Sequence, residues 1–226
     1  MPFTIHFAES SNFVTDMILA AVLGLLIKKM YHLEKEGFFI KSWRQYFVLM
    51  AITILIGGFG HLLSYYCGVW LKMGSWIMSL IALFVLERNM LKMVVLPTVT
   101  RFIPALKLFF FLVLTIITQQ FLPTKTGIAL GMVFIICPIL LYFNFKTENT
   151  GYRLIVISIL MNGFGGLAHA KNIALADWFN GGDLAHFISA VSFIGMYFGF
   201  KQVALNDTKI VEEEFEEQDL ELDVKY

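Results

Sequence analysis

Residues 108–117 read LFFFLVLTII, an unbroken apolar run inside the longer stretch 104–122. A transmembrane α-helix needs about 20 mostly apolar residues to cross a hydrocarbon core about 30 Å thick. A transmembrane β-strand would instead alternate apolar and polar residues over about 10 positions, and this run does not alternate. Because every backbone amide inside a bilayer needs an internal partner, the stretch predicts a membrane-spanning helix.

The same length and character recur along most of the chain. Six further spans are predicted, at 12–31, 46–67, 74–92, 127–144, 154–172 and 183–203. The composition agrees, with 58% hydrophobic and 15% charged residues, whereas a soluble domain has about 45–50% apolar and about 25% charged residues. These values exclude a soluble enzyme, a disordered chain and, with two cysteines, a disulfide scaffold. The predicted fold is an all-α polytopic membrane protein with seven transmembrane helices.

The net charge of zero hides an asymmetry along the chain. Residues 1–204 hold 15 Lys/Arg and 8 Asp/Glu, and residues 205–226 hold 2 and 9. We therefore predict a seven-helix membrane domain at 1–204 and an acidic cytoplasmic tail at 205–226. The loops after the first, third and fifth spans carry eleven basic residues, Lys107 among them, against three after the second, fourth and sixth. The positive-inside rule then predicts an outside N-terminus.

Two segments of the chain resemble each other. Residues 51–60, AITILIGGFG, align without gaps on residues 156–165, VISILMNGFG. A duplication would pair spans two and three with spans six and seven and leave span four as the odd helix, a parallel repeat of three, one and three helices. Chance recurrence of Ile, Leu, Gly and Phe is an equal alternative.

Ionisable residues gather at the predicted outer end of the bundle. His61, His169 and His186 lie toward the outer ends of spans two, six and seven, and Glu9 and Asp16 lie at the outer end of span one. Such residues are costly inside a membrane and mark functional sites. The sequence predicts no comparable group in the inner half.

Three histidines with a water molecule are a common zinc arrangement, and zinc activates that water. The predicted ligands are His61, His169 and His186. The predicted groups that handle protons are Asp183, Asp16 and Glu9. A polar pocket without a metal is an equal alternative, and three unrelated packing roles are the remaining one.

Seven spans, an outside N-terminus, an acidic residue opening span one, and histidines in spans two and seven together resemble the CREST superfamily. That superfamily includes the alkaline ceramidases and the progestin/adiponectin receptors, and the resemblance implies a zinc site built from three histidines. The family patterns are Ser-x-x-x-His on the second helix, His-x-x-x-His on the seventh and an Asp on the third. His61 and His186 match, but Gly57 and Gly182 replace the Ser and the first His of the pair, and span three has no Asp. His169 would then supply the third imidazole.

The first function predicted is a zinc-dependent membrane hydrolase that acts on a lipid amide or ester at the outer leaflet. The alternative is a small seven-helix transporter, or a membrane protein that binds a lipid or a partner, with an outer histidine pocket and no metal. Transport is disfavoured by polar residues that crowd one face instead of the midplane. A b-type haem protein is a weaker reading. A retinal pigment is disfavoured because Lys201 lies at the inner end of span seven. The lipid bilayer is the expected partner, and no nucleic-acid motif occurs.

Overall fold

The computed structural model describes residues 10–33, 37–94, 97–171, 173, 175, 176 and 179–223, with side chains described at all of these except 97–101 and 206–223. The helices are α1 (Ser10–Tyr31), α2 (Phe38–Leu62), the short α3 (Ser64–Cys67), α4 (Trp70–Leu91), α5 (Pro97–Thr118), α6 (Phe121–Gly131), α7 (Cys137–Thr147), α8 (Thr150–Ala170) and α9 (Gly181–Asp223). The π-helical segment η1 (Met132–Ile136) joins α6 to α7, so that these three segments form one long helix.

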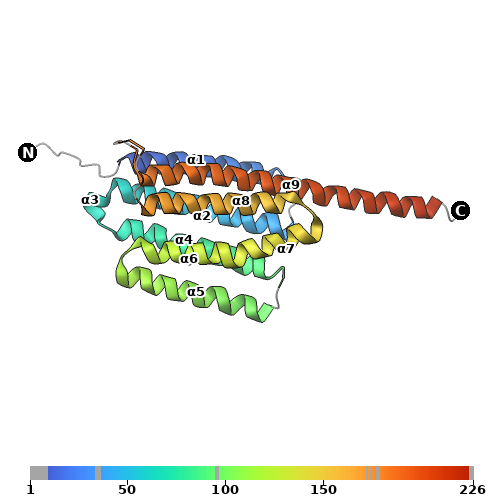
Figure 1. Ribbon diagram of the computed structural model, residues 1–226, viewed down its shortest axis with the longest axis horizontal. Helices are drawn as coiled ribbons and strands as arrows, with labels where there is room; N and C mark the ends of the chain where they lie inside the picture. Colours follow the sequence, from blue (N-terminus) through green and yellow to red (C-terminus); the bar gives the residue numbers. More distant parts are fainter. Residues whose placement is uncertain are drawn as a thin grey trace, which may run out of the picture.

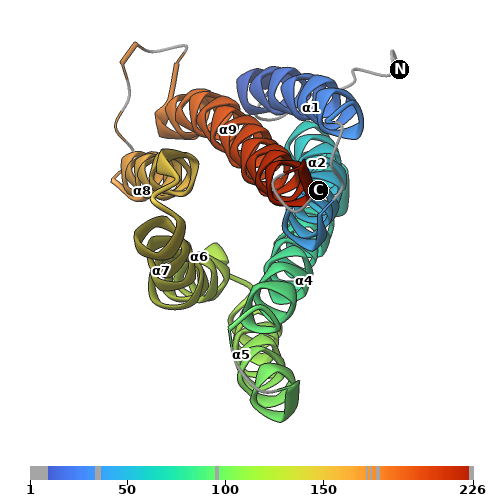
Figure 2. The ribbon, with the colours of Figure 1, turned by 90° about the vertical axis from the view of Figure 1, so that its right-hand side faces the viewer.

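The long helices lie side by side as a bundle (Figure 1). The short α3 and the start of α1 lie at one end, and α9 projects beyond the other. We call these the α3 end and the tail end. Along the bundle axis, α9 lies beside α1 and α8, whereas α5 lies at the edge (Figure 2) and packs mainly on α4 and α6.

Six of the described helices are long and apolar enough to cross a membrane: α1, α2, α4, α8, the continuous helix 121–147 and residues 181–205 of α9. The prediction of an all-α membrane protein is confirmed. The remaining predicted span falls on α5, of which Phe102–Thr118 counts as a shorter apolar helix. The span predicted at 46–67 begins earlier, at Phe38, because Phe39, Ile40 and Trp43 already bury their side chains inside the bundle.

Aromatic side chains form the core in the tail half of the bundle. Trp43 and Phe47 of α2 and Phe193 and Phe200 of α9 are all buried. The ring centroids of Trp43 and Phe200 are 5.1 Å apart, as are those of Phe47 and Phe193. These are favourable aromatic separations, so the tail half holds α2 and α9 together while their other ends carry polar groups.

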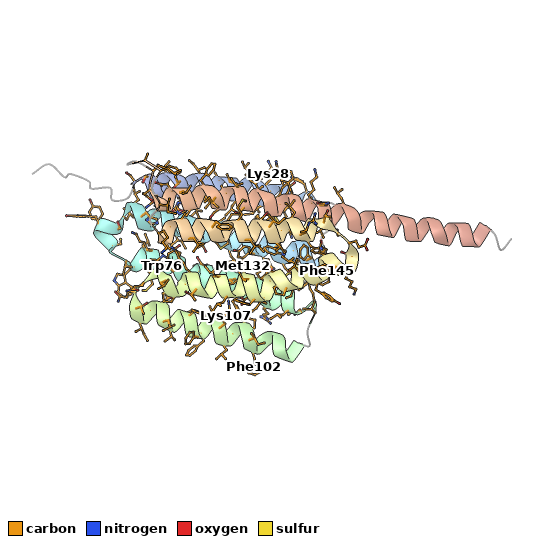
Figure 3. The ribbon with its side chains drawn as sticks, in the orientation of Figure 1. Lys28, Trp76, Phe102, Lys107, Met132 and Phe145 are labelled. Atoms are coloured by element: carbon orange, nitrogen blue, oxygen red, sulfur yellow. The ribbon has the colours of Figure 1, made fainter. Side chains whose placement is uncertain are left out.

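The outward surface of α5 is apolar. Phe102 and Ile117 are each 73% exposed and Leu106 is 71% exposed, and Figure 3 shows Phe102 on the side of α5 away from the bundle. A water-soluble protein rarely exposes such a contiguous patch. This face is therefore suited to contact lipid.

The π-helical segment has a local cause. Pro138 is the second residue of α7, two residues after η1 ends at Ile136. A proline inside a helix has no N–H to donate, and its ring clashes with the carbonyl four residues earlier, here that of Phe134. One wider turn accommodates the ring, as in other interrupted helices.

The last helix continues beyond its apolar part. Past Leu205, α9 remains helical to Asp223, through the segment predicted as an acidic tail. The boundary at residue 204 between a membrane domain and a tail stays a prediction.

Candidate functional site

At the α3 end, one buried carboxylate lies between two histidines from other helices. Asp16 of α1 is 4% exposed. His186 Nε2 of α9 lies 3.2 Å from Asp16 Oδ1, and His61 Nε2 of α2 lies 4.0 Å from Asp16 Oδ2. The two imidazole centroids are 6.4 Å apart. Two of the predicted ligands and one predicted acid therefore meet, brought together by the consecutive helices α1 and α2 and by the distant α9.

A threonine connects this group to a second buried carboxylate. Thr15 Oγ1 lies 2.9 Å from His186 Nδ1 and 3.0 Å from Asp183 Oδ1. Asp183 is fully buried, and its Oδ2 accepts a hydrogen bond from the backbone N–H of Asn180 at 3.0 Å. A polar chain thus runs from Asp16 through His186 and Thr15 to Asp183; we call it the Asp16 chain.

The hydrogen bonds of the Asp16 chain depend on where the Thr15 hydroxyl donates; besides Asp183 and His186, the carbonyl oxygens of Ser11 and Asn12 lie 3.2 and 3.1 Å from it. The Thr15 hydroxyl carries one proton and donates to one acceptor at a time. When both ring nitrogens of His186 are protonated, Nδ1–H donates to Thr15, and the hydroxyl can donate to Asp183. When Nδ1 is unprotonated, the hydroxyl can donate to it instead, and Asp183 Oδ1 then loses that donor. A proton gained or lost at His186 can therefore change the hydrogen bond that Asp183 Oδ1 accepts from Thr15.

Asn180 explains why Asp183 lies here. Its side-chain Oδ1 accepts from the backbone N–H groups of Gly182 at 2.7 Å and Asp183 at 3.2 Å, which satisfies donors at the start of α9. Its Nδ2 donates to Ser11 Oγ of α1 at 3.3 Å. An acidic residue in the first turn is also favoured by the helix dipole. The loop before α9 thus places Asp183 against α1.

Two glycines of α2 allow the helices to approach Asp16. A Cβ at Gly58 would lie 3.1 Å from Asp16 Cβ and 2.6 Å from the terminal methyl of Met17. A Cβ at Gly57 would lie 2.9 Å from Ser75 Oγ of α4. Small residues of this kind permit close packing of transmembrane helices, so α1 and α4 both contact α2 beside the carboxylate.

His169 interacts electrostatically with His186, but its hydrogen-bond and ring contacts described here are with α6. Its Nδ1 lies 2.9 Å from Lys125 Nζ of α6, and its ring lies 6.0 Å from that of Phe121. Across the described part of the chain, no group of three or more His, Cys, Asp or Glu side chains is arranged to hold a metal ion. The three histidines are thus not described in a metal-binding arrangement, and the zinc site stays a prediction. Glu9 lies outside the described residues.

A second ionisable centre lies elsewhere in the bundle. Glu87 of α4 is fully buried, and its Oε1 lies 2.6 Å from Lys107 Nζ of α5. Lys107 also donates to the carbonyl oxygen of Gly127 at 2.9 Å. Figure 3 labels Lys107 between α5 and α6, near the middle of the bundle. Ionisable groups are therefore not confined to the α3 end, and Lys107 belongs to α5 and not to a loop.

The Glu87–Lys107 pair requires a glycine at position 131. A Cβ at Gly131 would overlap Glu87 Oε1 and lie 2.6 Å from Lys107 Nζ. Gly127 and Gly131 have the spacing of two small residues four apart, which marks close helix packing in membranes. That spacing, together with a lysine flanked by apolar residues on both sides, is the sequence signal that could have indicated a buried charge here. The signal was overlooked because Lys107 was assigned to a loop.

Gly131→Ala is expected to destabilise the protein by about 1–3 kcal/mol, because the added methyl overpacks a filled site. The matched control is Gly24→Ala on α1, where a Cβ would meet nothing within 4 Å. That change should be neutral or raise stability slightly, since alanine favours helix. Thermal unfolding of both variants in detergent checks the prediction. Equal melting temperatures for the two would contradict it.

Apolar helices of membrane length that enclose ionisable groups at two places define a polytopic α-helical integral membrane protein. The chain belongs to a family of unknown function, DUF6962, whose sequence model matches residues 11–205. The match runs from α1 through the apolar part of α9 and includes both ionisable centres. Comparison with the curated proteins and with the solved structures gave no match.

Proposed function

We propose that the chain is a seven-helix membrane transporter that couples proton exchange at Asp16 to the movement of a small amine-bearing solute. The observation that carries the proposal is the Asp16 chain, because it links α1 to α9 through groups whose hydrogen-bonding roles depend on their protonation. Proton relays of Asp, Glu and His are characteristic of membrane pumps and transporters. Two nearby carboxylates favour a cationic ligand.

The seventh span in this proposal is α5, whose 22 helical residues extend about 33 Å at 1.5 Å per residue. The layout of three, one and three helices then groups α1, α2 and α4, leaves α5 single, and groups α6–α7, α8 and α9. Aligned glycines support it. A Cβ at Gly60 would lie 3.0 Å from the backbone nitrogen of Lys72 in α4, and one at Gly165 would lie 3.2 Å from the carbonyl oxygen of Ala185 in α9.

The proposed orientation places the α3 end outside. Removing Lys107 from the eleven basic residues assigned to the inner loops leaves ten, against three on the other side. The bias therefore persists under the positive-inside rule. In this orientation a solute reaches His61 and His186 from the outside, and their side chains are 22% and 19% exposed.

The Glu87–Lys107 pair supports transport over the other readings. The sequence argument against a transporter was that the polar residues crowd one face instead of the midplane, and this pair supplies charged groups near the middle of the bundle. It also contacts α6 just before the π-helical segment η1. Such segments occur frequently at functional sites. We expect α6 and α7 to bend at η1 as the solute passes.

The test uses the purified full chain in liposomes that contain a trapped pH-sensitive dye. A panel of small amines and matched neutral solutes is added at about pH 5.5 and about pH 7.5, on either side of the normal imidazole titration. Wild-type protein should move protons with at least one amine. Thr15→Val removes the hydroxyl between His186 and Asp183 and should abolish that flux. Thr15→Ser keeps the hydroxyl and should retain it.

Two results would contradict the proposal. One is wild-type protein that behaves as empty liposomes do with every solute at both pH values. The other is Thr15→Val with wild-type flux, since the hydroxyl would then have no part in coupling. Melting temperatures of both threonine variants in detergent control for misfolding.

A zinc-dependent lipid amidase or esterase is the second candidate. It is favoured because His61 and His186 both direct Nε2 toward Asp16, and because Ser75 Oγ lies beside Gly57, where the CREST resemblance has a serine hydroxyl. Metal content measured on wild type and on His61→Ala, His169→Ala and His186→Ala decides this candidate. About one zinc per chain, lost in all three variants, would support it, and a metal-free wild type supplied with zinc would reject it.

A further inference from the structure

A groove runs along the surface between α1 and α9 in the tail half of the bundle. Its volume is about 580 Å³. The residues that line it are Val22, Leu25, Leu26, Lys29, His32, Leu33, Ile194, Tyr197, Phe198 and Lys201. On α9 the lining extends from Ile194 to Lys201, seven residues or about 10 Å along the axis. The groove is therefore long enough for a substantial part of an acyl chain.

The two halves of the groove differ in chemistry. Toward the middle of the membrane its lining is aliphatic and aromatic, with Leu25 63% and Phe198 54% exposed. Toward the tail end it holds Lys29, His32 and Lys201, all exposed. The described lining contains no acidic residue to neutralise them. Lys29 Nζ also lies 5.9 Å from the centre of the Tyr197 ring, so its stem lies along the groove wall.

We infer that this groove binds one anionic phospholipid from the leaflet at the tail end, with an acyl chain between α1 and α9 and the phosphate at Lys29 and Lys201. The aliphatic half fits an acyl chain, and the cations at its end fit a phosphate at the depth of the headgroups. Basic pockets between transmembrane helices on the cytoplasmic side are known to bind anionic headgroups. A neutral lipid would leave the cations uncompensated. A soluble anion would leave the aliphatic half empty.

The inference is independent of the proposed transport function, because the groove shares no residue with the Asp16 chain or with the Glu87–Lys107 pair. It also does not depend on the orientation, since it names the leaflet by the end of the bundle at which α9 projects. A bound lipid here would join α1 to α9, the two helices that carry Asp16 and His186.

The experiment is native mass spectrometry of the full chain in detergent, titrated with phosphatidylglycerol or phosphatidylcholine of matched acyl chains. Wild type should bind one phosphatidylglycerol at least about tenfold more tightly than phosphatidylcholine, given about fivefold per lysine near an anionic headgroup. Lys29→Gln with Lys201→Gln should remove that preference. The matched control, Lys28→Gln with Lys41→Gln, makes the same charge change at exposed lysines outside the groove and should keep it.

A variant that blocks the aliphatic half tests the acyl chain separately. Leu25→Trp should weaken binding of the long-chain lipid at least about fivefold, which corresponds to burial of one or two methylenes, and should leave the melting temperature unchanged. Equal affinity for the two lipids in wild type would overturn the inference. So would an equal loss in the Lys28/Lys41 control, or equal binding of short-chain, water-soluble phosphatidylglycerol.

Discussion

Lys107→Met is expected to lower the free energy of unfolding by about 3–5 kcal/mol, the cost of removing one partner of a buried ion pair. Glu87 is fully buried between α4, α5 and α6, and Lys107 is its described ion-pair partner. Without that ammonium, the carboxylate has no route to water. Glu87→Met should cost less, because the Lys107 side chain is 16% exposed and its stem is long enough to move the charge. Reversible unfolding in mixed micelles, followed by tryptophan fluorescence, measures both.

The double variant Glu87→Met/Lys107→Met separates structure from function. Replacing a whole buried pair by apolar residues of similar volume is often neutral or stabilising, so the double variant should recover most of the stability lost in Lys107→Met. Under the transport proposal, which gives this pair a part in the passage of the solute, the double variant should show no proton flux. A double variant as unstable as Lys107→Met would mean that the two charges do not interact. A stable double variant with full proton flux would mean that the pair stabilises the fold and has no part in transport.

Asp16→Asn is expected to abolish proton-linked transport while the protein still folds. Asparagine has nearly the same shape as aspartate but does not exchange a proton at neutral pH, and the Nε2 groups of His61 and His186 would then face an amide. The flux should fall to the level of empty liposomes. The melting temperature should change little, since the substitution adds no volume at the contact with Gly58.

His169→Gln is the matched control for this prediction. His169 lies beside Lys125 and Phe121 and also interacts electrostatically with His186. If Asp16 is the group that exchanges the proton, the variant should still transport. If Asp16→Asn kept the wild-type proton flux, Asp16 would not be the group that exchanges the proton. Equal loss in both variants would indicate that His169 belongs to the same site, as the three-histidine hypothesis requires.

The fold class could be read from the sequence because bilayer thickness imposes a length on every span. The ends of the helices were less predictable. Residues 38–45 hold polar residues among apolar ones and were read as loop, yet Phe39 and Trp43 pack inside the bundle and extend α2 by two turns. Hydropathy averages over all faces of a helix, whereas burial depends on the one face that meets a neighbour.

The candidate site was only partly predictable. Helix ends at one membrane face are brought to a common depth, so Asp16, His61 and His186 could be grouped from the sequence. Whether His169 joins them depends on which way α8 faces, and one sequence does not encode that rotation in its hydropathy. Thr15 was not anticipated as a connecting group because its role depends on its distance to Asp183 across two helices. The Glu87–Lys107 pair was missed since Lys107 was assigned to a loop and Glu87 was not considered.

The buried pair also bears on how the chain enters the membrane during synthesis. A lysine near the centre of an isolated apolar helix makes its insertion less favourable by about 2.5–3.5 kcal/mol. Glu87 is synthesised before Lys107, on the preceding long helix, and Gly127, whose carbonyl oxygen accepts from Lys107, is synthesised after both. The nascent α5 can thus leave the translocon already paired with α4, and α6 then closes over the charges. The order of the three helices along the chain is also the order in which the charges become sheltered from lipid.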